Sequence, residues 1–142
     1  MPLTPAEREE FLAEPRIAAL SVDSGDPNRG PVSVPIWYQY ERGGDVWILT
    51  GTTSRKAELI AAAGRFTLLV ERTEPTVRYV SVEGPVVETA PVTDARHREL
   101  VARYLPADKA AAYLEFAERD LGEQVMIRMR PQSWIAADLG SL

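Results

Sequence analysis

The chain has 142 residues, no cysteine and a formal net charge of −5 at pH 7, and its length suits a single domain over residues 1–142. The acidic balance argues against a nucleic-acid partner, which needs a basic face, and the absence of cysteine excludes thiol nucleophiles, disulfides and thiolate metal sites. The absence of cysteine makes a reducing cytoplasm the expected location. No stretch is apolar for long enough to span a bilayer, so we expect no membrane partner.

The first third of the chain is predicted to form one helix and three strands. Thr4–Glu7 has the spacing of a capping box, so a short helix should begin there and end before Pro15. Alternating apolar side chains and turn-forming residues predict strands over residues 17–22, 32–40 and 46–50. Three strands in succession imply antiparallel pairing.

The remaining residues are predicted to form three helices and four more strands. Caps and apolar spacing place the helices over residues 55–63, 94–104 and 107–119, and the strands over 66–71, 77–87, 124–130 and 133–137. Gly84 and Pro85 predict a bulge or bend in the long strand. Six or seven short antiparallel strands with few helices indicate a mainly β fold, a closed or nearly closed β-barrel with peripheral helices.

A candidate anion site lies where a strand ends and a helix begins. Thr50 and Gly51 end the strand, Ser54 precedes the helix, and Arg55 and Lys56 occupy its first turn. Cations there oppose the helix dipole unless an anion lies between them and the free amides. A phosphate would accept hydrogen bonds from the hydroxyls, the amides and the guanidinium. The alternative is an ordinary N-cap with two solvated cations.

Other side chains do not form a conventional catalytic set. The only histidine, His97, lies between Arg96 and Arg98 on a predicted helix, where we expect it to be solvated. One histidine and scattered carboxylates lack the spacing of metal ligands, and no Gly-x-Ser-x-Gly elbow is present. The sequence therefore predicts neither a catalytic side chain nor a metal site.

Two motifs resemble a known family. Thr50, Ser54, Arg55 and Lys56 are similar to the phosphate-binding element of the pyridoxamine 5′-phosphate oxidase-like split barrels, where a Ser-Arg-Lys run opens the same helix. Arg78–Gly84 resembles the Arg-x-Val-x-Val-Glu-Gly strand of that group. The order and spacing agree over nearly the whole chain.

The resemblance implies a homodimer of split barrels with a flavin or deazaflavin in a groove at the subunit interface. The cofactor ring would rest against Pro35, Ile36 and Trp37, and its phosphate would bind the Thr50–Lys56 element. Pro35 removes a ladder donor, which independently indicates a strand segment that is not fully paired. Arg78 would approach the cofactor or the partner chain, although a cross-strand ion pair is the alternative.

In this family the cofactor carries the reaction, and the protein supplies position, electrostatics and exclusion of water. True pyridoxamine phosphate oxidases end in a segment that bears arginine and histidine, whereas Arg128–Trp134 contains no histidine, which argues against vitamin B6 oxidation. The compact layout is closer to the branch that uses F420, whose acidic tail suits a basic groove. We therefore expect hydride transfer between F420 or FMN and a small conjugated substrate, with a non-catalytic carrier or sensor, an FMN oxidase, or a barrel without cofactor as alternatives.

Overall fold

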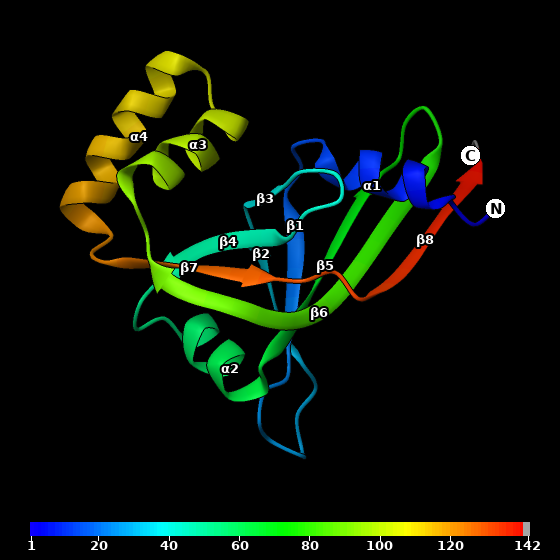
Figure 1. Ribbon diagram of the computed structural model, residues 1–142, viewed down its shortest axis with the longest axis horizontal. Helices are drawn as coiled ribbons and strands as arrows, with labels where there is room; N and C mark the ends of the chain where they lie inside the picture. Colours follow the sequence, from blue (N-terminus) through cyan, green and yellow to red (C-terminus); the bar gives the residue numbers. More distant parts are fainter. Residues whose placement is uncertain (141–142) are drawn as a thin grey trace.

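The computed structural model describes residues 1–140, in which four helices surround eight strands (Figure 1). In chain order the elements are α1 (Pro5–Ala13), β1 (Ala18–Val22), β2 (Val32–Ile36), β3 (Tyr38–Tyr40), β4 (Val46–Gly51), α2 (Arg55–Ala63), β5 (Arg65–Arg72), β6 (Val77–Pro91), α3 (Asp94–Tyr104), α4 (Ala107–Asp120), β7 (Gln124–Met129) and β8 (Ser133–Gly140). Within these residues, no helix combines the length and the apolar composition that crossing a membrane requires.

The strands form an antiparallel sheet whose two edges are neighbours in the sequence. The strand order is β2-β1-β5-β6-β7-β4-β3, and β8 pairs with β6 beside this path. Only Trp37 separates β2 from β3, so the sheet curls until its edges meet at this residue. The predicted split-barrel fold is thereby confirmed. The strands number eight rather than the expected six or seven because the strand predicted over 32–40 divides at Trp37.

Strand β6 is the longest strand and connects the parts of the sheet. Residues 78–85 pair with β5, residues 77–83 pair with β8, and residues 86–91 pair with β7. The register shifts between Val86 and Glu88, which puts a bulge beside the predicted Gly84-Pro85 bend. A Cβ atom on Gly84 would lie 1.8 Å from the carbonyl oxygen of Arg130, so glycine is required where the β7–β8 connection crosses this strand.

The barrel interior is filled by apolar side chains that alternate along the strands. The largest fully buried members on strands are Tyr38, Tyr40, Phe66, Leu20, Ile48, Leu68, Ile127 and Met129. Helix α1 adds Phe11 and Leu12 to this core. Strand β4 is buried on both faces, because Trp47 and Leu49 pack with Leu100 of α3 in a second, smaller cluster.

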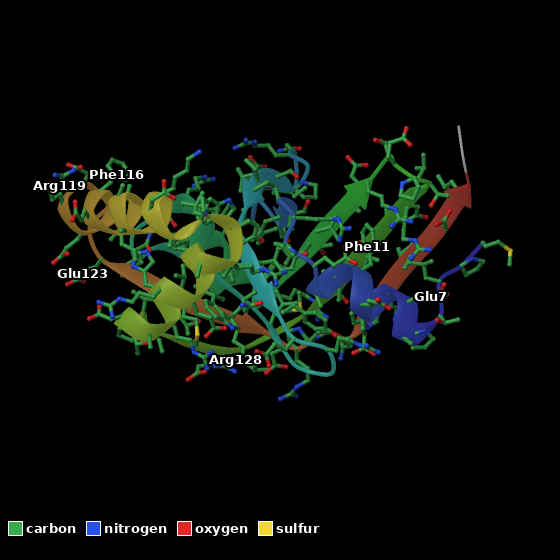
Figure 2. All side chains as sticks on the ribbon, turned by 90° about the horizontal axis from the view of Figure 1, so that it is seen from above. Glu7, Phe11, Phe116, Arg119, Glu123 and Arg128 are labelled. Atoms are coloured by element: carbon green, nitrogen blue, oxygen red, sulfur yellow. The ribbon has the colours of Figure 1, made fainter. Side chains whose placement is uncertain are left out.

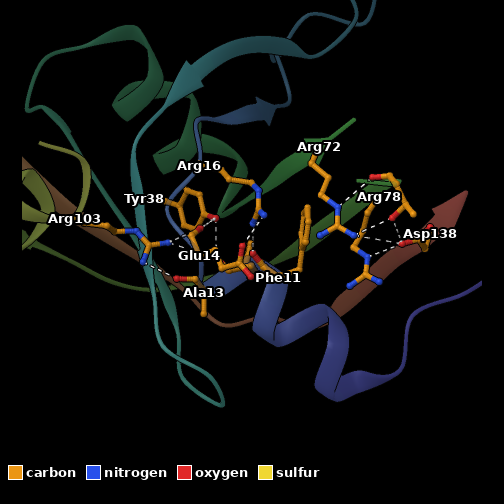
Figure 3. A network of polar contacts seen from close by, with 11 residues as sticks. Phe11, Ala13, Glu14, Arg16, Tyr38, Arg72, Arg78, Arg103 and Asp138 are labelled. Atoms are coloured by element: carbon orange, nitrogen blue, oxygen red, sulfur yellow. Dashed lines mark hydrogen bonds and ion pairs between the residues drawn. The ribbon is translucent and has the colours of Figure 1, made fainter. Parts of the chain in front are cut away.

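Helices α3 and α4 form a hairpin outside the barrel wall, and α4 lies at the end of the molecule far from the start of α1 (Figure 2). The hairpin is fastened through α3. The Arg103 guanidinium donates to the carbonyl oxygen of Ala13 at 2.8 Å, next to the carbonyl of Glu14 that accepts at 3.1 Å (Figure 3). The Tyr104 hydroxyl accepts from the backbone N–H of Tyr38 at 3.1 Å. These bonds hold α3 against the end of α1 and against β3, the strand that follows Trp37.

Candidate functional site

The turn from β4 into α2 brings four predicted site residues together; Thr50, Ser54, Arg55 and Lys56 are called the α2 corner below. The Ser54 hydroxyl accepts from the backbone N–H of Ala57 at 3.1 Å, so it caps the helix. It also lies 2.8 Å from the hydroxyl of Thr50, which is buried in the barrel wall. The hydrogen bond between the two hydroxyls fixes the Ser54 side chain at the start of α2.

Within residues 1–140, the positive groups at the α2 corner have no protein partner. Arg55 is exposed and Lys56 is half-buried, and neither forms an ion pair with any residue between 1 and 140. In the same part of the chain, the backbone N–H groups of both residues have no backbone acceptor. Free N–H groups and cations at a helix N-terminus together favour binding of an anion.

The other predicted segment, Pro35–Trp37, lines a cavity of about 280 Å³ between the strands and the α3–α4 hairpin. We call it the smaller cavity. Its wall is mainly apolar and consists of Ile17, Pro35, Ile36, Trp37, Leu49, His97, Leu100, Val101, Tyr113 and Gln124. Strand β2 pairs only with β1, so Pro35 lies on an edge strand, where the missing N–H leaves no ladder bond unmade. The edge of the sheet at Pro35–Trp37 therefore provides an apolar wall of this cavity.

The Trp37 indole is held by the protein's own aromatic rings. It stacks on Tyr104 with a centroid distance of 4.7 Å and an interplanar angle of 9°, and Tyr113 lies 5.4 Å away. The indole thus has a fixed orientation as part of the cavity wall. Tyr38, the next aromatic side chain along the chain, is completely buried in the barrel core.

Strand β4 joins the smaller cavity to the α2 corner. Leu49 lines the cavity, and the strand continues through Thr50 to Gly51. Gly51 is the register partner of Gln124 on β7, which also lines the cavity. The apolar wall and the positively charged corner are therefore neighbours along β4, although Leu49 and Thr50, as successive residues of a strand, face opposite sides of the sheet.

Arg78 lies elsewhere, at the α1 end of the barrel. Its Nε atom donates to the Asp138 carboxylate at 2.9 Å across the β6–β8 pair, so the observed contact is the cross-strand ion pair (Figure 3). The Thr76 hydroxyl, the Gly140 N–H and the Arg78 guanidinium lower the pKa of Asp138 to about 2. The carboxylate is also 3.6 Å from Arg72. The structure does not bring Arg78 to the α2 corner.

A second cavity, of about 1000 Å³, lies between the α3–α4 hairpin and β7, and we call it the larger cavity. His97 and Gln124 line both cavities. His97 is half-buried rather than solvated as expected, and burial lowers its pKa. The sequence holds a signal for this position, because His97 has helical spacing to the buried residues Leu100 and Val101.

No group of three or more histidine and acidic side chains that could hold a metal ion occurs in the part of the chain that the structure describes.

Comparisons with known proteins were made for the sequence and for the fold of the chain. A family model described as pyridoxamine 5′-phosphate oxidase matches residues 4–137. No curated protein matches the sequence at a significant level.

Several solved structures share the fold. A conserved hypothetical protein from Mycobacterium tuberculosis is 22% identical with a TM-score of 0.70, and the match covers 96% of this chain and 85% of that one. An F420 reductase is 26% identical with a TM-score of 0.68, and the match covers 89% and 94%. A FAD-binding protein from Mesorhizobium loti is 16% identical with a TM-score of 0.62, and the match covers 97% and 95%.

Proposed function

This chain belongs to the pyridoxamine 5′-phosphate oxidase family, and from this membership we propose that it is an oxidoreductase that transfers hydride between F420 or FMN and a small conjugated organic substrate. The observation that carries the proposal is the α2 corner. Two cations and two backbone N–H groups that have no backbone acceptor within residues 1–140 lie together there at the start of one helix. The similarity to an F420 reductase supports the choice of cofactor class.

The residues present fit the phosphate of such a cofactor. Arg55 offers a planar fork of donors, Lys56 offers a point charge, and the helix N-terminus offers free amides. Ser54 and Thr50 add hydroxyl groups whose hydrogen atoms can rotate toward the anion while the oxygen atoms stay in place. When bound, a flavin or deazaflavin supplies the hydride chemistry. The protein's part is to orient the ring against Pro35–Trp37 and to exclude water from it.

F420 is the favoured cofactor, and FMN is the alternative. The cationic α2 corner suits the acidic oligoglutamate tail of F420, but either molecule places a phosphate ester within the same reach. The family's vitamin B6 chemistry is disfavoured because Arg128–Trp134 contains no histidine. A non-catalytic carrier with the same site is the second candidate. The proposed location is the cytoplasm, because the chain has no cysteine.

We further propose a homodimer, as the family resemblance implies. One row of side chains crosses the outer face of the sheet through Pro35, Ala19, Leu69, Ser81 and Ile135 in register. Leu69 is 39% exposed and Ile135 is 66% exposed, which is typical of an interface between copies. This face continues into the smaller cavity through Pro35, so the dimer would place the cofactor beside the partner subunit.

Titration of the purified protein with F420 and with FMN, followed by cofactor fluorescence, tests the proposal. We expect saturable binding, and oxidation of the reduced cofactor by at least one member of a panel of quinones and enones. Binding without turnover would support the carrier instead. Binding of neither cofactor would contradict both candidates.

The double variant Arg55→Ala/Lys56→Ala tests the location of the site. If both side chains contact phosphate, affinity should fall by roughly 2–4 kcal/mol. The matched control is Lys109→Ala, which removes a cation from the first turn of α4 and should leave affinity unchanged. Equal affinity of the double variant and the wild type would show that the cofactor phosphate does not bind at the α2 corner.

A further inference from the structure

Tyr104, the last residue of α3, bridges the seam, which is the position at Trp37 where the two edges of the curled sheet meet. Its hydroxyl accepts from the backbone N–H of Tyr38, the first residue of β3, at 3.1 Å. The same hydroxyl donates to the carbonyl oxygen of Arg16 at 2.8 Å, and the Tyr38 carbonyl oxygen lies 3.1 Å from it. One side chain therefore connects the segment that leads into β1 with the start of β3.

The Tyr104 ring also fixes the residue at the seam itself. It stacks on the Trp37 indole with a centroid distance of 4.7 Å and an interplanar angle of 9°. Because Trp37 directly precedes Tyr38, one tyrosine holds both the indole and the backbone that follows it. Trp37 lines the smaller cavity, whereas Tyr104 is not part of its wall. Tyr104 thus supports the wall through Trp37.

The position of Tyr104 is itself fixed by its neighbour Arg103. The Arg103 guanidinium donates to the carbonyl oxygen of Ala13 at 2.8 Å and to the Oε1 atom of Gln39 at 2.9 Å (Figure 3). Its central carbon lies 5.7 Å from the centroid of the Tyr104 ring. Contacts to α1 on one side and to β3 on the other restrict the end of α3 to one position, so the stacking geometry is defined by the tertiary structure.

Tyr113 of α4 provides a natural comparison, because it lies against the same indole. Its ring is 5.4 Å from Trp37 and tilted by 38°. Within residues 1–140, hydrogen bonds are made by the hydroxyls of Tyr38, Tyr40 and Tyr104 but not by that of Tyr113. The two tyrosines that contact Trp37 therefore differ in whether the hydroxyl is bonded to the backbone.

We propose that Tyr104 is a positioning residue of the cofactor site, which sets, through Trp37, the plane against which a flavin or deazaflavin ring rests. Planar π-systems pack face to face with an offset, so the tilt of the indole determines the tilt of a ring that contacts it. The inference rests on the proposed function in one respect, since it requires the ring to lie against Pro35–Trp37. Tyr104 acts without touching the ring, because it does not line the cavity.

Near-ultraviolet circular dichroism of the cofactor-free protein tests the hold of Tyr104 on the indole. The chain has three tryptophans, so the Trp37 signal is taken as the difference that Trp37→Phe makes in each background. Tyr104→Phe should lose most of this signal, because the Tyr38 N–H and the Arg16 carbonyl lose their partner and the seam relaxes. Tyr113→Phe makes the same chemical change at an unbonded hydroxyl and should keep the signal.

Equal Trp37 signals in the wild type and in Tyr104→Phe, with folding verified in the far ultraviolet, would overturn the inference. If Tyr104→Phe does not fold, Arg103→Lys takes its place, because it removes the guanidinium fork that fixes the end of α3. Loss of the Trp37 signal in Arg103→Lys would support the inference, and an unchanged signal would contradict it.

Fluorescence of the bound cofactor tests the effect on the ring. We expect the emission of FMN, or of F420 if only F420 binds, to be quenched in the wild type by contact with the indole and restored in Trp37→Leu. Tyr104→Phe should restore much of the emission while its calorimetric affinity stays within about threefold, because the phosphate still binds at the α2 corner. A substitution that only destabilised the protein would not change the quenching of the bound cofactor. Unchanged quenching in Tyr104→Phe would therefore contradict a positioning role.

The failure of this inference and the failure of the proposed function give different results. If neither FMN nor F420 binds to the wild type, the proposed function is contradicted. If a cofactor binds but Tyr104→Phe changes neither the Trp37 signal nor the quenching, the proposed function stands and the positioning role of Tyr104 is contradicted.

Discussion

The two sequence motifs that resemble the same family differ in whether the rest of the protein supplies partners for their side chains. The β6 motif, Arg78–Gly84, is completed by the fold, because Arg78 pairs with Asp138 and Gly84 lies against the carbonyl of Arg130. The α2 corner is not, because the cations of Arg55 and Lys56 have no protein partner within residues 1–140. A motif whose groups are satisfied internally stabilises the structure, and one whose groups are left open is available to a ligand.

The difference also explains why arginine alone is a weak guide to function. Arg55 was expected to bind the cofactor phosphate, and Arg78 was expected to approach the cofactor or the partner chain. Arg78 lies beside a carboxylate, a threonine hydroxyl and a second guanidinium in a closed network (Figure 3). Arg55 is exposed at a helix start with free amides around it. The surroundings, rather than the residue type, separate the two roles.

The largest expected effect comes from the β6 motif. Gly84→Ala places a Cβ atom 1.8 Å from the Arg130 carbonyl oxygen and 2.9 Å from its carbon, and neither backbone atom can move without displacing a strand. We expect destabilisation of more than about 4 kcal/mol, or insoluble protein, measured by urea unfolding. Gly30→Ala, with open space around the new methyl group, is the matched control and should be nearly neutral. A stable Gly84→Ala protein would show that this crossing is not required.

Ser54 caps α2 and also belongs to the α2 corner, so its variants separate a structural role from a role in binding an anion. Ser54→Ala should cost about 1 kcal/mol of stability through the lost cap and should also weaken cofactor binding. Ser54→Asp keeps the cap but adds a negative charge, so stability should recover while binding is lost. Thr4→Ala removes the equivalent cap of α1 and should lower stability alone. Recovery of binding in Ser54→Asp would contradict an anion at this corner.

The smallest expected effect is at the Arg78 end of the β6 motif. The folded pKa of Asp138 is about 2, below its ordinary value of 3.8, so its stabilising contribution is complete above pH 4 and is lost as the pH falls toward 2. Asp138→Asn should lower the urea midpoint at neutral pH, and the difference from wild type should shrink across that acid range. Cofactor affinity at neutral pH should not change. If the difference in urea midpoint between the variant and the wild type stays constant with pH, the ion pair is not its cause.

Most of the fold was predictable from local patterns. The capping box at Thr4–Glu7, the cap at Ser54 and the strand alternation all formed as expected, because each depends on groups close together in the sequence. The division of the strand at Trp37 was not predictable in this way. It arises because the two edges of the curled sheet meet there, and only the complete barrel defines that position.

The site was predictable in part. The α2 corner was found because its residues are consecutive, and Pro35–Trp37 was found through the resemblance. His97 was expected to be solvated because its neighbours Arg96 and Arg98 suggested an exposed helix. The tertiary packing of α3 on β4, through Leu100 and Trp47, decides that this face of the helix turns toward the cavities. Gln124 gave no sequence signal at all.

The most direct test of the open α2 corner compares cofactors with and without a phosphate. FMN and riboflavin, or F420 and its phosphate-free deazaflavin core, should be titrated into the wild type and into Arg55→Ala/Lys56→Ala. We expect the wild type to prefer the phosphorylated member by about 2–4 kcal/mol and the double variant to lose most of that preference. An equal preference in both proteins would place the phosphate elsewhere and contradict the account.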